Sequence, residues 1–245
     1  MKPIIGIMPR EEFDEKFEIS YIYTYESVRR MILDMGGVPL IITPCENTDM
    51  YKTSFNDFPN LEDEYKSVMK MYLDKIDGLF LPGGSKYTKF DLEFIDAAIK
   101  RYIPILGVCL GAQSLSNYKK EFSLEKIESK INHNTKEKYA HSIKIDKEST
   151  LYKIIGKENI MVNSYHNRQM SPNPLFRSVA YAEDGVLEAI EMIGNDFVMG
   201  LQWHPEKMYK YDLNSKKILD YFIKKCEIYS KEKKRVVKIW QEYLI

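Results

Sequence analysis

The stretch Ile103–Tyr118, which reads IPILGVCLGAQSLSNY, decides the fold. Its first six residues form an apolar run typical of a buried strand, and Leu110–Tyr118 has the pattern of a helix. Only Cys109 separates the two segments. A strand that turns directly into a helix is typical of an α/β fold built on a parallel sheet.

The rest of the first half repeats this alternation. Strands are predicted at Ile4–Met8, Val38–Ile42 and Gly78–Leu81, and helices at Tyr23–Met35, Tyr65–Leu73 and Asp91–Arg101. Strands that alternate with helices predict βαβ units and a parallel sheet.

The second half changes in character. Short apolar runs predict further strands, which extend the sheet as antiparallel pairs, at His141–Ile145, Ile160–Val162, Val179–Ala182, Val186–Met192 and Phe197–Gln202. Two helices are predicted after them, at Asn214–Cys226 and Ser230–Tyr243. We therefore expect an α/β fold with one open, mixed but mainly parallel sheet flanked by helices, in a single domain over residues 1–245.

The composition excludes several classes of protein. The 245 residues are 44% hydrophobic and 29% charged, which indicates a globular chain and not a disordered one. Because 36 Lys and Arg balance 36 Asp and Glu, we expect neither nucleic acid nor membrane as a partner. The apolar runs are too short to span a bilayer and the N-terminus lacks a signal-peptide pattern, so we expect a cytoplasmic protein. The odd set Cys45, Cys109 and Cys226, without CxxC spacing, disfavours disulfides and a Cys-rich zinc site.

Four segments follow predicted strand ends, where ligands bind in a doubly wound sheet. They are Pro82-Gly83-Gly84, GVCLGAQ at 107–113, NSYH at 163–166 and QWHPE at 202–206. We expect the functional site among them.

Cys109 is the first candidate for chemistry. Gly107 and Gly111 flank it between strand and helix, a pattern typical of a nucleophile elbow with sulfur in place of oxygen. The turn leaves no room for bulky neighbours, hence glycine. The N-terminus of the following helix offers partial positive charge and free N–H groups, which stabilise a thiolate and an oxyanion. The alternative is a buried, unreactive cysteine.

His204 and Glu206 form the second candidate. Alternate residues of an extended segment point the same way, and Pro205 biases His204 toward extended geometry. The carboxylate can then hold one imidazole nitrogen and leave the other free for a thiol, as a cysteine nucleophile needs. The alternatives are a surface turn and a metal site. We disfavour a metal because the His-x-Glu signature of zinc deaminases needs a later Pro-Cys-x-x-Cys, which this sequence lacks.

Taken together, GVCLGAQ, PGG, VNSYH and GLQWHPE resemble the class I glutamine amidotransferase superfamily. Within it, they most resemble the peptidase C26 branch of stand-alone γ-glutamyl hydrolases, which includes γ-glutamyl-γ-aminobutyrate hydrolase. The N-terminal IIGIMPR and the later TYESVRRMILDMGGVPLIITP are similar to the opening of that branch. The resemblance runs over nearly the whole chain and implies a flavodoxin-like fold.

The resemblance also implies roles for individual residues. Cys109 matches the nucleophile, His204 the base and Glu206 the acid that orients it. The backbone N–H groups of the oxyanion hole match Gly83, Gly84 and Leu110. The positions that face the α-amino and α-carboxylate groups of the substrate match Gln113, Ser164, Tyr165 and His166. For His166, a structural role at a strand end stays open.

The sequence departs from the family pattern after the nucleophile. Asn117–Phe122 reads NYKKEF and lacks the usual Gly-Gly, which indicates a rebuilt pocket wall. We interpret His133 and His141 as surface or structural residues, because only His204 combines a strand end with a carboxylate partner. The loop Glu11–Ser20 follows the first strand and could act as a lid.

Three residues near that loop could also line the site. Arg10, Tyr21 and Tyr23 lie beside it, but we favour surface or core packing for them.

We expect a cysteine-dependent hydrolase that cleaves a γ-glutamyl amide through a thioester, with the small γ-glutamyl amide as its ligand. It requires no cofactor or metal, since neither GxGxxG nor GxxxxGK[ST] occurs. One alternative is a glutaminase subunit that delivers ammonia to a synthase. Another is an inactive, ligand-binding protein on the same fold. The sequence leaves open which amine departs and whether the chain forms a homodimer.

Overall fold

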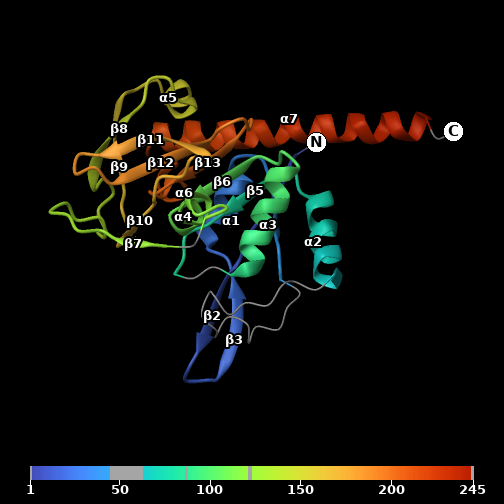
Figure 1. Ribbon diagram of the computed structural model, residues 1–245, viewed down its shortest axis with the longest axis horizontal. Helices are drawn as coiled ribbons and strands as arrows, with labels where there is room; N and C mark the ends of the chain where they lie inside the picture. The colour runs from blue at the N-terminus through green and yellow to red at the C-terminus, as the bar shows by residue number, and fades with distance from the viewer. Residues whose placement is uncertain (1, 45–62, 86–87, 121–122, 244–245) are drawn as a thin grey trace.

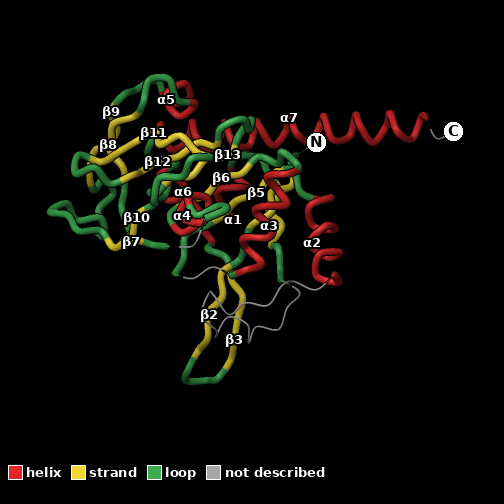
Figure 2. Tube along the Cα trace, viewed as in Figure 1, coloured by secondary structure: helices red, strands yellow, loops and turns green. Residues whose placement is uncertain are grey.

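A nine-stranded sheet forms the centre of the protein (Figures 1 and 2). The computed structural model describes residues 2–44, 63–85, 88–120 and 123–243. The strands are β1 (Ile4–Ile7), β4 (Val38–Ile41), β5 (Gly78–Leu81), β6 (Ile105–Val108), β8 (His141–Ile145), β9 (Asn159–Val162), β11 (Phe176–Ala182), β12 (Leu187–Met192) and β13 (Val198–Leu201). Their order in the sheet is β4-β1-β5-β6-β13-β12-β11-β8-β9.

The sheet is mixed, and its parallel part is the half that holds β6. The strands β4, β1, β5, β6 and β13 pair in parallel. The strands β12, β11, β8 and β9 continue the sheet from β13 as antiparallel pairs. The predicted α/β fold with a mixed sheet is therefore confirmed. The last predicted strand was expected only to extend the sheet as part of an antiparallel pair. The observed strand β13 pairs antiparallel with β12 on one side and parallel with β6 on the other, so it joins the two halves of the sheet.

Helices cover both faces of the sheet. They are α1 (Glu26–Asp34), α2 (Asp63–Lys75), α3 (Lys89–Lys100), α4 (Leu110–Ser116), α5 (Thr150–Ile155), α6 (Pro205–Met208) and α7 (Leu213–Tyr243). Buried side chains of α1, α5 and α7 share one core cluster, and those of α2, α3 and α4 share the other. Successive residues of β5 alternate between these clusters, with Phe80 in the first and Leu79 and Leu81 in the second. This alternation places one apolar core on each side of the sheet.

The C-terminal helix differs from the prediction. Two helices were expected, but Leu213–Tyr243 is one continuous helix of 31 residues. No Gly or Pro interrupts these residues, so no strong local signal ends the helix near Ser230. Figure 1 shows α7 running along the sheet and beyond it. Among the described residues, no helix has both the length and the apolar character needed to cross a bilayer.

The segment expected to be a loop after the first strand is a hairpin. The strands β2 (Arg10–Asp14) and β3 (Ile19–Tyr23) pair antiparallel and project away from the central sheet (Figures 1 and 2). Asp14 closes the turn, because its Oδ1 accepts hydrogen bonds from the backbone N–H groups of Lys16 and Phe17 at 2.9 and 3.1 Å. A second small sheet pairs β7 (Glu125–Lys126) with β10 (Arg168–Gln169).

Two of the predictions fall partly on residues outside the described ranges. Cys45 lies outside them, and so do residues 121–122 of the segment that departs from the family pattern. Cys109 and Cys226 are buried free thiols.

Close backbone packing fixes the turn between β6 and α4. A Cβ added to Gly111 would lie 2.1 Å from the carbonyl oxygen of Leu81 in β5. A Cβ added to Gly107 would lie 2.7 Å from the carbonyl oxygen of Gly111. Both obstacles are backbone atoms that cannot rotate away. The two glycines therefore let α4 start directly against the neighbouring strand.

We predict that Gly111→Ala destabilises the protein by about 3 kcal/mol, because its methyl group would overlap the backbone of β5. Gly6→Ala in β1 is the matched control, since the three atoms nearest its Cβ are side-chain atoms that can shift, Cδ1 of Ile42 at 2.6 Å and two atoms of Ile76 at 3.1 Å. The free energy of unfolding of both variants, measured in urea, checks the order. Equal losses for the two variants would contradict the packing argument.

Candidate active site

Cys109 lies at the junction of β6 and α4 with an unusual backbone conformation. Its φ and ψ angles are 51° and −106°, a region that L-residues rarely adopt. The backbone is held from both sides: the N–H of Cys109 donates to Leu201 O at 2.8 Å, and the N–H of Gln113 donates to Cys109 O at 3.0 Å. The thiol thus sits at the N-terminus of α4, where backbone N–H groups lack helical partners. Leu110, a predicted oxyanion-hole residue, is the first residue of this helix.

His204 and Glu206 lie in contact just past the end of β13. The Nδ1–H of His204 donates to Glu206 Oε1 at 2.7 Å, and both side chains are buried. The predicted contact is present, but its expected geometry was wrong. Pro205 starts the short helix α6, so Glu206 reaches His204 from a helical turn and not from an extended segment.

Cys109 and His204 meet over the turn Pro82-Gly83-Gly84. His204 and Cys109 both line the pocket above this turn. A Cβ added to Gly83 would lie 2.8 Å from Cε1 of His204 and 3.5 Å from Cβ of Cys109. Glycine at this position therefore keeps the space above the pair open. The structure brings together Cys109, His204, Glu206 and Gly83, which come from three separate strand ends.

The electrostatic environment of His204 favours its protonated form. Burial lowers the pKa of His204, but the carboxylate of Glu206 and the contacts with Cys109 outweigh burial and raise the pKa to about 9. An imidazolium at neutral pH can stabilise a thiolate on one side and donate a proton to a departing amine.

Asn163 is a positioning residue that the sequence analysis missed. Its Nδ2 donates to His204 O at 3.0 Å, and its Oδ1 accepts from the N–H of His204 at 2.8 Å. This pair of hydrogen bonds fixes the backbone of His204. The segment 163–166 had been singled out, but no role was given to Asn163, its first residue, which comes directly after the strand β9.

Arg10 supports the glycine turn from behind. Its Nε donates to Gly83 O at 3.0 Å, its Nη2 donates to Pro82 O, and its Nη1 lies 3.4 Å from Asp91 Oδ2. Arg10 is buried and does not line the pocket, which agrees with the packing role favoured from the sequence. The guanidinium thereby holds the turn that contains the predicted oxyanion-hole residues Gly83 and Gly84.

A pocket of about 250 Å³ opens above the thiol. It is lined by Tyr23, Tyr25, Gly83, Gly84, Ser85, Cys109, Tyr165, His204, Glu206 and Lys207. Tyr165 packs edge-on against the His204 ring at 5.4 Å between centroids, and Nζ of Lys207 lies 4.2 Å from the centroid of the Tyr165 ring. Burial and a hydrogen bond with Tyr23 raise the pKa of Tyr25, so its hydroxyl stays protonated. The pocket combines an aromatic wall, one ammonium group and a nucleophile.

The other predicted substrate-binding residues lie outside this lining. Nε2 of Gln113 donates to Arg168 O at 2.9 Å, and Oγ of Ser164 donates to His133 O at 2.7 Å. His166 packs beside His133 with 5.0 Å between ring centroids. Of the segment 164–166, only Tyr165 faces the pocket. His133 is buried, and so is His141, so neither is a surface residue.

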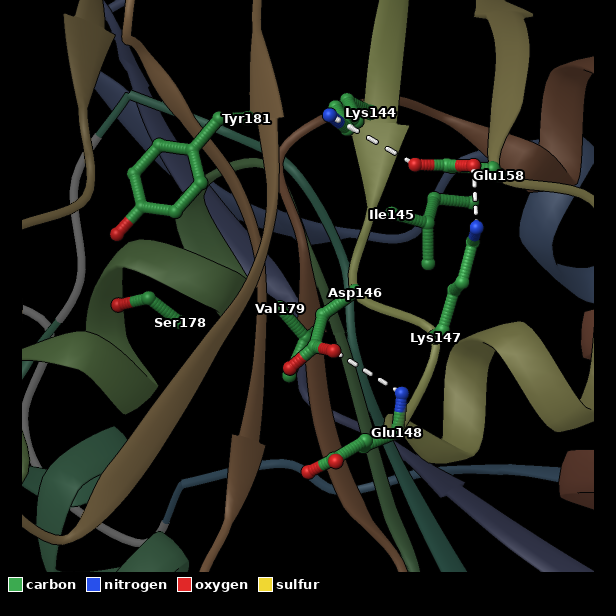
Figure 3. Close-up of a pocket in the computed structure, with 9 residues that line it drawn as sticks. All are labelled: Lys144, Ile145, Asp146, Lys147, Glu148, Glu158, Ser178, Val179 and Tyr181. Atoms are coloured by element: carbon green, nitrogen blue, oxygen red, sulfur yellow. Dashed lines mark hydrogen bonds and ion pairs between the residues drawn. The ribbon is translucent and has the colours of Figure 1, made fainter.

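A larger pocket of about 500 Å³ lies elsewhere, beside β8 and β11 (Figure 3). Its charged side chains pair with one another: Glu158 lies 3.0 Å from Lys147 Nζ and 3.6 Å from Lys144 Nζ. It holds no cysteine or histidine. This pocket therefore offers no group for nucleophilic or acid–base chemistry by histidine, and the smaller pocket at Cys109 is the candidate active site.

Comparisons with known proteins show what the chain is similar to. The sequence matches the family model of peptidase C26 over residues 86–206. A protein of Schizosaccharomyces pombe, provisionally named a glutamine amidotransferase, is 32% identical over 82% of this chain and 81% of its own length. The γ-glutamyl-γ-aminobutyrate hydrolase of Escherichia coli (strain K12) is 27% identical over 69% of this chain and 80% of its own.

A comparison of folds gives the same architecture. The solved structure of the CTPS glutaminase domain of Trypanosoma brucei, with bound acivicin, aligns with a TM-score of 0.63. The match covers 92% of this chain and 94% of that domain at 16% identity, and it shows a shared fold.

We predict that Glu206→Gln weakens the protein more at pH 6 than at pH 9.5. The raised pKa of His204 contributes stability that is complete below pH 6.5 and is lost as the pH rises through about 9. Gln accepts the same hydrogen bond but removes the charge, so the difference in unfolding free energy between wild type and variant should shrink by about 1–3 kcal/mol across this range.

Urea unfolding at the two pH values checks this prediction. Both proteins in this comparison carry Cys109→Ala, so that titration of the thiol does not contribute to the difference. A difference that is the same at pH 6 and pH 9.5 would mean that Glu206 does not set the charge of His204.

Proposed function

Because the chain belongs to the peptidase C26 branch of the class I glutamine amidotransferase-like superfamily, we propose that it hydrolyses a γ-glutamyl amide with Cys109 as the nucleophile. The amidohydrolase class rests on the family and on the named hydrolase relative. One observation supports the choice of residues: His204, which is hydrogen-bonded to Glu206, lines the same pocket as Cys109.

The first half of the reaction forms a thioester. The Cys109 thiolate attacks the γ-carbonyl carbon, and the carbonyl oxygen takes up negative charge. The N–H groups of Leu110 and of the Gly83-Gly84 turn would bind this oxyanion, and each such donor contributes about 3 kcal/mol in comparable sites. When the tetrahedral intermediate collapses, the C–N bond breaks and the His204 imidazolium gives its proton to the amine.

The second half releases glutamate. Neutral His204 takes a proton from a water molecule that attacks the thioester carbonyl, and the C–S bond then breaks to restore the thiolate. Glu206 keeps Nδ1 of His204 protonated and balances the charge that appears on the ring. Asn163 holds the backbone of His204 in place through both steps.

The pocket favours a substrate with a carboxylate on its leaving group. Lys207 places an ammonium group at the pocket edge, against the Tyr165 ring. The rings of Tyr23, Tyr25 and Tyr165 offer apolar surface for a short carbon chain. A γ-glutamyl ω-amino acid such as γ-glutamyl-γ-aminobutyrate combines both features.

The decisive test measures glutamate release by the purified chain alone. We expect turnover of γ-glutamyl-γ-aminobutyrate without any partner protein, and slower turnover of a γ-glutamyl polyamine and of glutamine. Cys109→Ala should abolish turnover with little change in unfolding free energy, because the nucleophile is lost and little volume is removed. Cys226→Ala is the control, since Cys226 is a buried core residue of α7 and does not line the pocket.

Two outcomes would contradict the proposal. Glutamine as the best substrate, with activity only after cell extract is added, would favour the glutaminase subunit. A fully active Cys109→Ala variant would exclude Cys109 as the nucleophile.

Lys207 gives a sharper prediction about specificity. Lys207→Met should raise the KM for γ-glutamyl-γ-aminobutyrate about tenfold, while the KM for the neutral γ-glutamyl butylamide changes little. The value of kcat should change little for either compound. Lys210→Met is the matched control, since Lys210 is exposed and does not line this pocket. An equal rise for both amides would assign Lys207 to the glutamyl half of the substrate instead.

A further inference from the structure

A second cluster of chemically active side chains lies behind the candidate active site. It consists of His133, His141, His166 and Glu188, and we call it the His3Glu cluster. All four residues are buried, with exposed fractions of 4, 6, 4 and 0%. One potential metal-binding atom from each residue lies within 4.8 Å of the other three. The reaction proposed above uses none of these residues.

The distances inside the cluster are those of metal ligands around a common centre. Glu188 Oε1 lies 3.5 Å from His133 Nδ1, 3.7 Å from His141 Nε2 and 3.6 Å from His166 Nε2. These distances are too long for good hydrogen bonds. Ligand bonds of 2.0–2.1 Å in a tetrahedral zinc site separate neighbouring ligand atoms by about 3.4 Å. The three distances from Glu188 are close to this value, and all four atoms lie within 4.8 Å of one another, so side-chain movements of about 1 Å would let them bind one ion.

The outer nitrogen of each imidazole is already engaged. Nε2 of His133 lies 2.9 Å from Asp184 Oδ2, Nδ1 of His141 lies 3.3 Å from Ser142 O, and Nδ1 of His166 lies 3.0 Å from Arg168 O. A carboxylate or carbonyl oxygen can only accept, so in each ring this nitrogen carries the hydrogen. The inner nitrogen of each neutral ring then presents a lone pair toward Glu188. Outer contacts of this kind are typical of histidines that bind metals.

Of the inner atoms, His133 Nδ1 lies 3.5 Å from Ser164 Oγ, and the others lack a further partner in the part of the chain that the structure describes. Within the described residues, Nε2 of His141, Nε2 of His166 and both carboxylate oxygens of Glu188 are buried without a hydrogen bond. Inward lone pairs that face a buried carboxylate repel it unless a proton or a metal cation lies between them, and a single metal ion could satisfy all four groups at once. We propose that the His3Glu cluster binds one divalent metal ion, with zinc as the preferred ion.

The donor set favours zinc over the common hard cations. Three imidazole nitrogens and one carboxylate oxygen suit zinc and its neighbours among the transition metals, whereas calcium and magnesium prefer oxygen ligands throughout. Four protein ligands complete a tetrahedron and leave no open position for substrate. The ion therefore has a structural role and takes no part in the hydrolysis.

A metal ion bound in the His3Glu cluster would hold residues 163–166 in place, and this segment forms one wall of the active site. Along 163–166, Asn163 holds His204 and Tyr165 lines the pocket, whereas Ser164 and His166 point to the other side, toward His133. The backbone N–H of His166 also donates to His133 O at 2.8 Å. A metal bound by His133 and His166 would thus lock the strand end that carries Asn163 and Tyr165.

A pocket of about 430 Å³ is lined by residues 126–127, 129–134 and 166–167, including His133 and His166. Two of the four ligands therefore lie next to a surface pocket.

The sequence analysis predicted no metal because it considered only the spacing of the cysteines and the pair His204 and Glu206. The cluster instead joins residues 133, 141, 166 and 188, which no short motif links.

Metal content of the full chain without a histidine tag tests the proposal. The protein is treated with a chelator, dialysed against zinc sulfate, passed over a desalting column and analysed for zinc by mass spectrometry. We expect one equivalent of zinc, a zinc-dependent rise in Tm, and the visible absorption of tetrahedral cobalt after substitution with Co²⁺. Folded wild-type protein that retains no zinc would overturn the proposal.

Variants locate the ion. Glu188→Gln should weaken zinc binding at least tenfold and remove the rise in Tm. Asp184→Asn leaves the four ligands in place and weakens the outer contact of His133, so it should weaken zinc binding about tenfold. Asp184 also accepts from Ser129 Oγ and Val186 N, and its partly exposed position keeps this variant informative if Glu188→Gln does not fold. Wild-type zinc affinity in both folded variants would overturn the assignment.

The matched control removes the metal-binding groups of the candidate active site. The double variant Cys109→Ser, His204→Asn lacks the remaining histidine of the chain and the active-site thiol but keeps the His3Glu cluster. It should bind one equivalent of zinc as the wild type does. Loss of zinc in this variant would place the ion at Cys109. The measurement needs no substrate, so its result is independent of the proposed hydrolase activity.

Discussion

The contact between Gly111 and the carbonyl of Leu81 is the constraint on which the catalytic edge depends. Because no side chain separates α4 from β5, the helix begins immediately after β6, and the chain has one residue in which to reverse direction. That residue is Cys109, whose positive φ is the result. The strain at Cys109 is of order 1–3 kcal/mol, and the packing of the two elements around it maintains this conformation.

Buried polar side chains also hold the residues of the catalytic edge in position. Arg10 reaches under the glycine turn from the start of the hairpin, Asn163 clamps the backbone of His204, and Glu206 orients its ring. Each of these side chains is buried and hydrogen-bonded. Its removal would therefore lower the stability of the fold, and its position is well defined. The site therefore combines elements from both ends of the chain: the first strand region, the central elbow and the turn after β13.

Sequence reasoning succeeded where a local pattern determines the structure. The strand–Cys109–helix junction and the pair His204 and Glu206 are short-range features, and the parallel sheet follows from the alternation of elements. It failed where contacts between residues far apart in the sequence determine the structure. The parallel insertion of β13 beside β6, the support by Arg10 and the meeting of His133 with His141 and His166 all depend on tertiary contacts that no spacing reveals. The uninterrupted α7 is a different case, since a polar stretch near Ser230 resembled a break but contained no residue that ends a helix.

The alternation along 163–166 has a consequence for how this chain can change over evolution. Odd-numbered residues of the segment serve the hydrolytic pocket and even-numbered ones serve the buried histidines. Insertion or deletion of a single residue would exchange the two sets, because side chains of an extended segment alternate. A short polar stretch of this kind would ordinarily tolerate changes of length. Here its length is fixed, and lineages can vary the side chains only within each set.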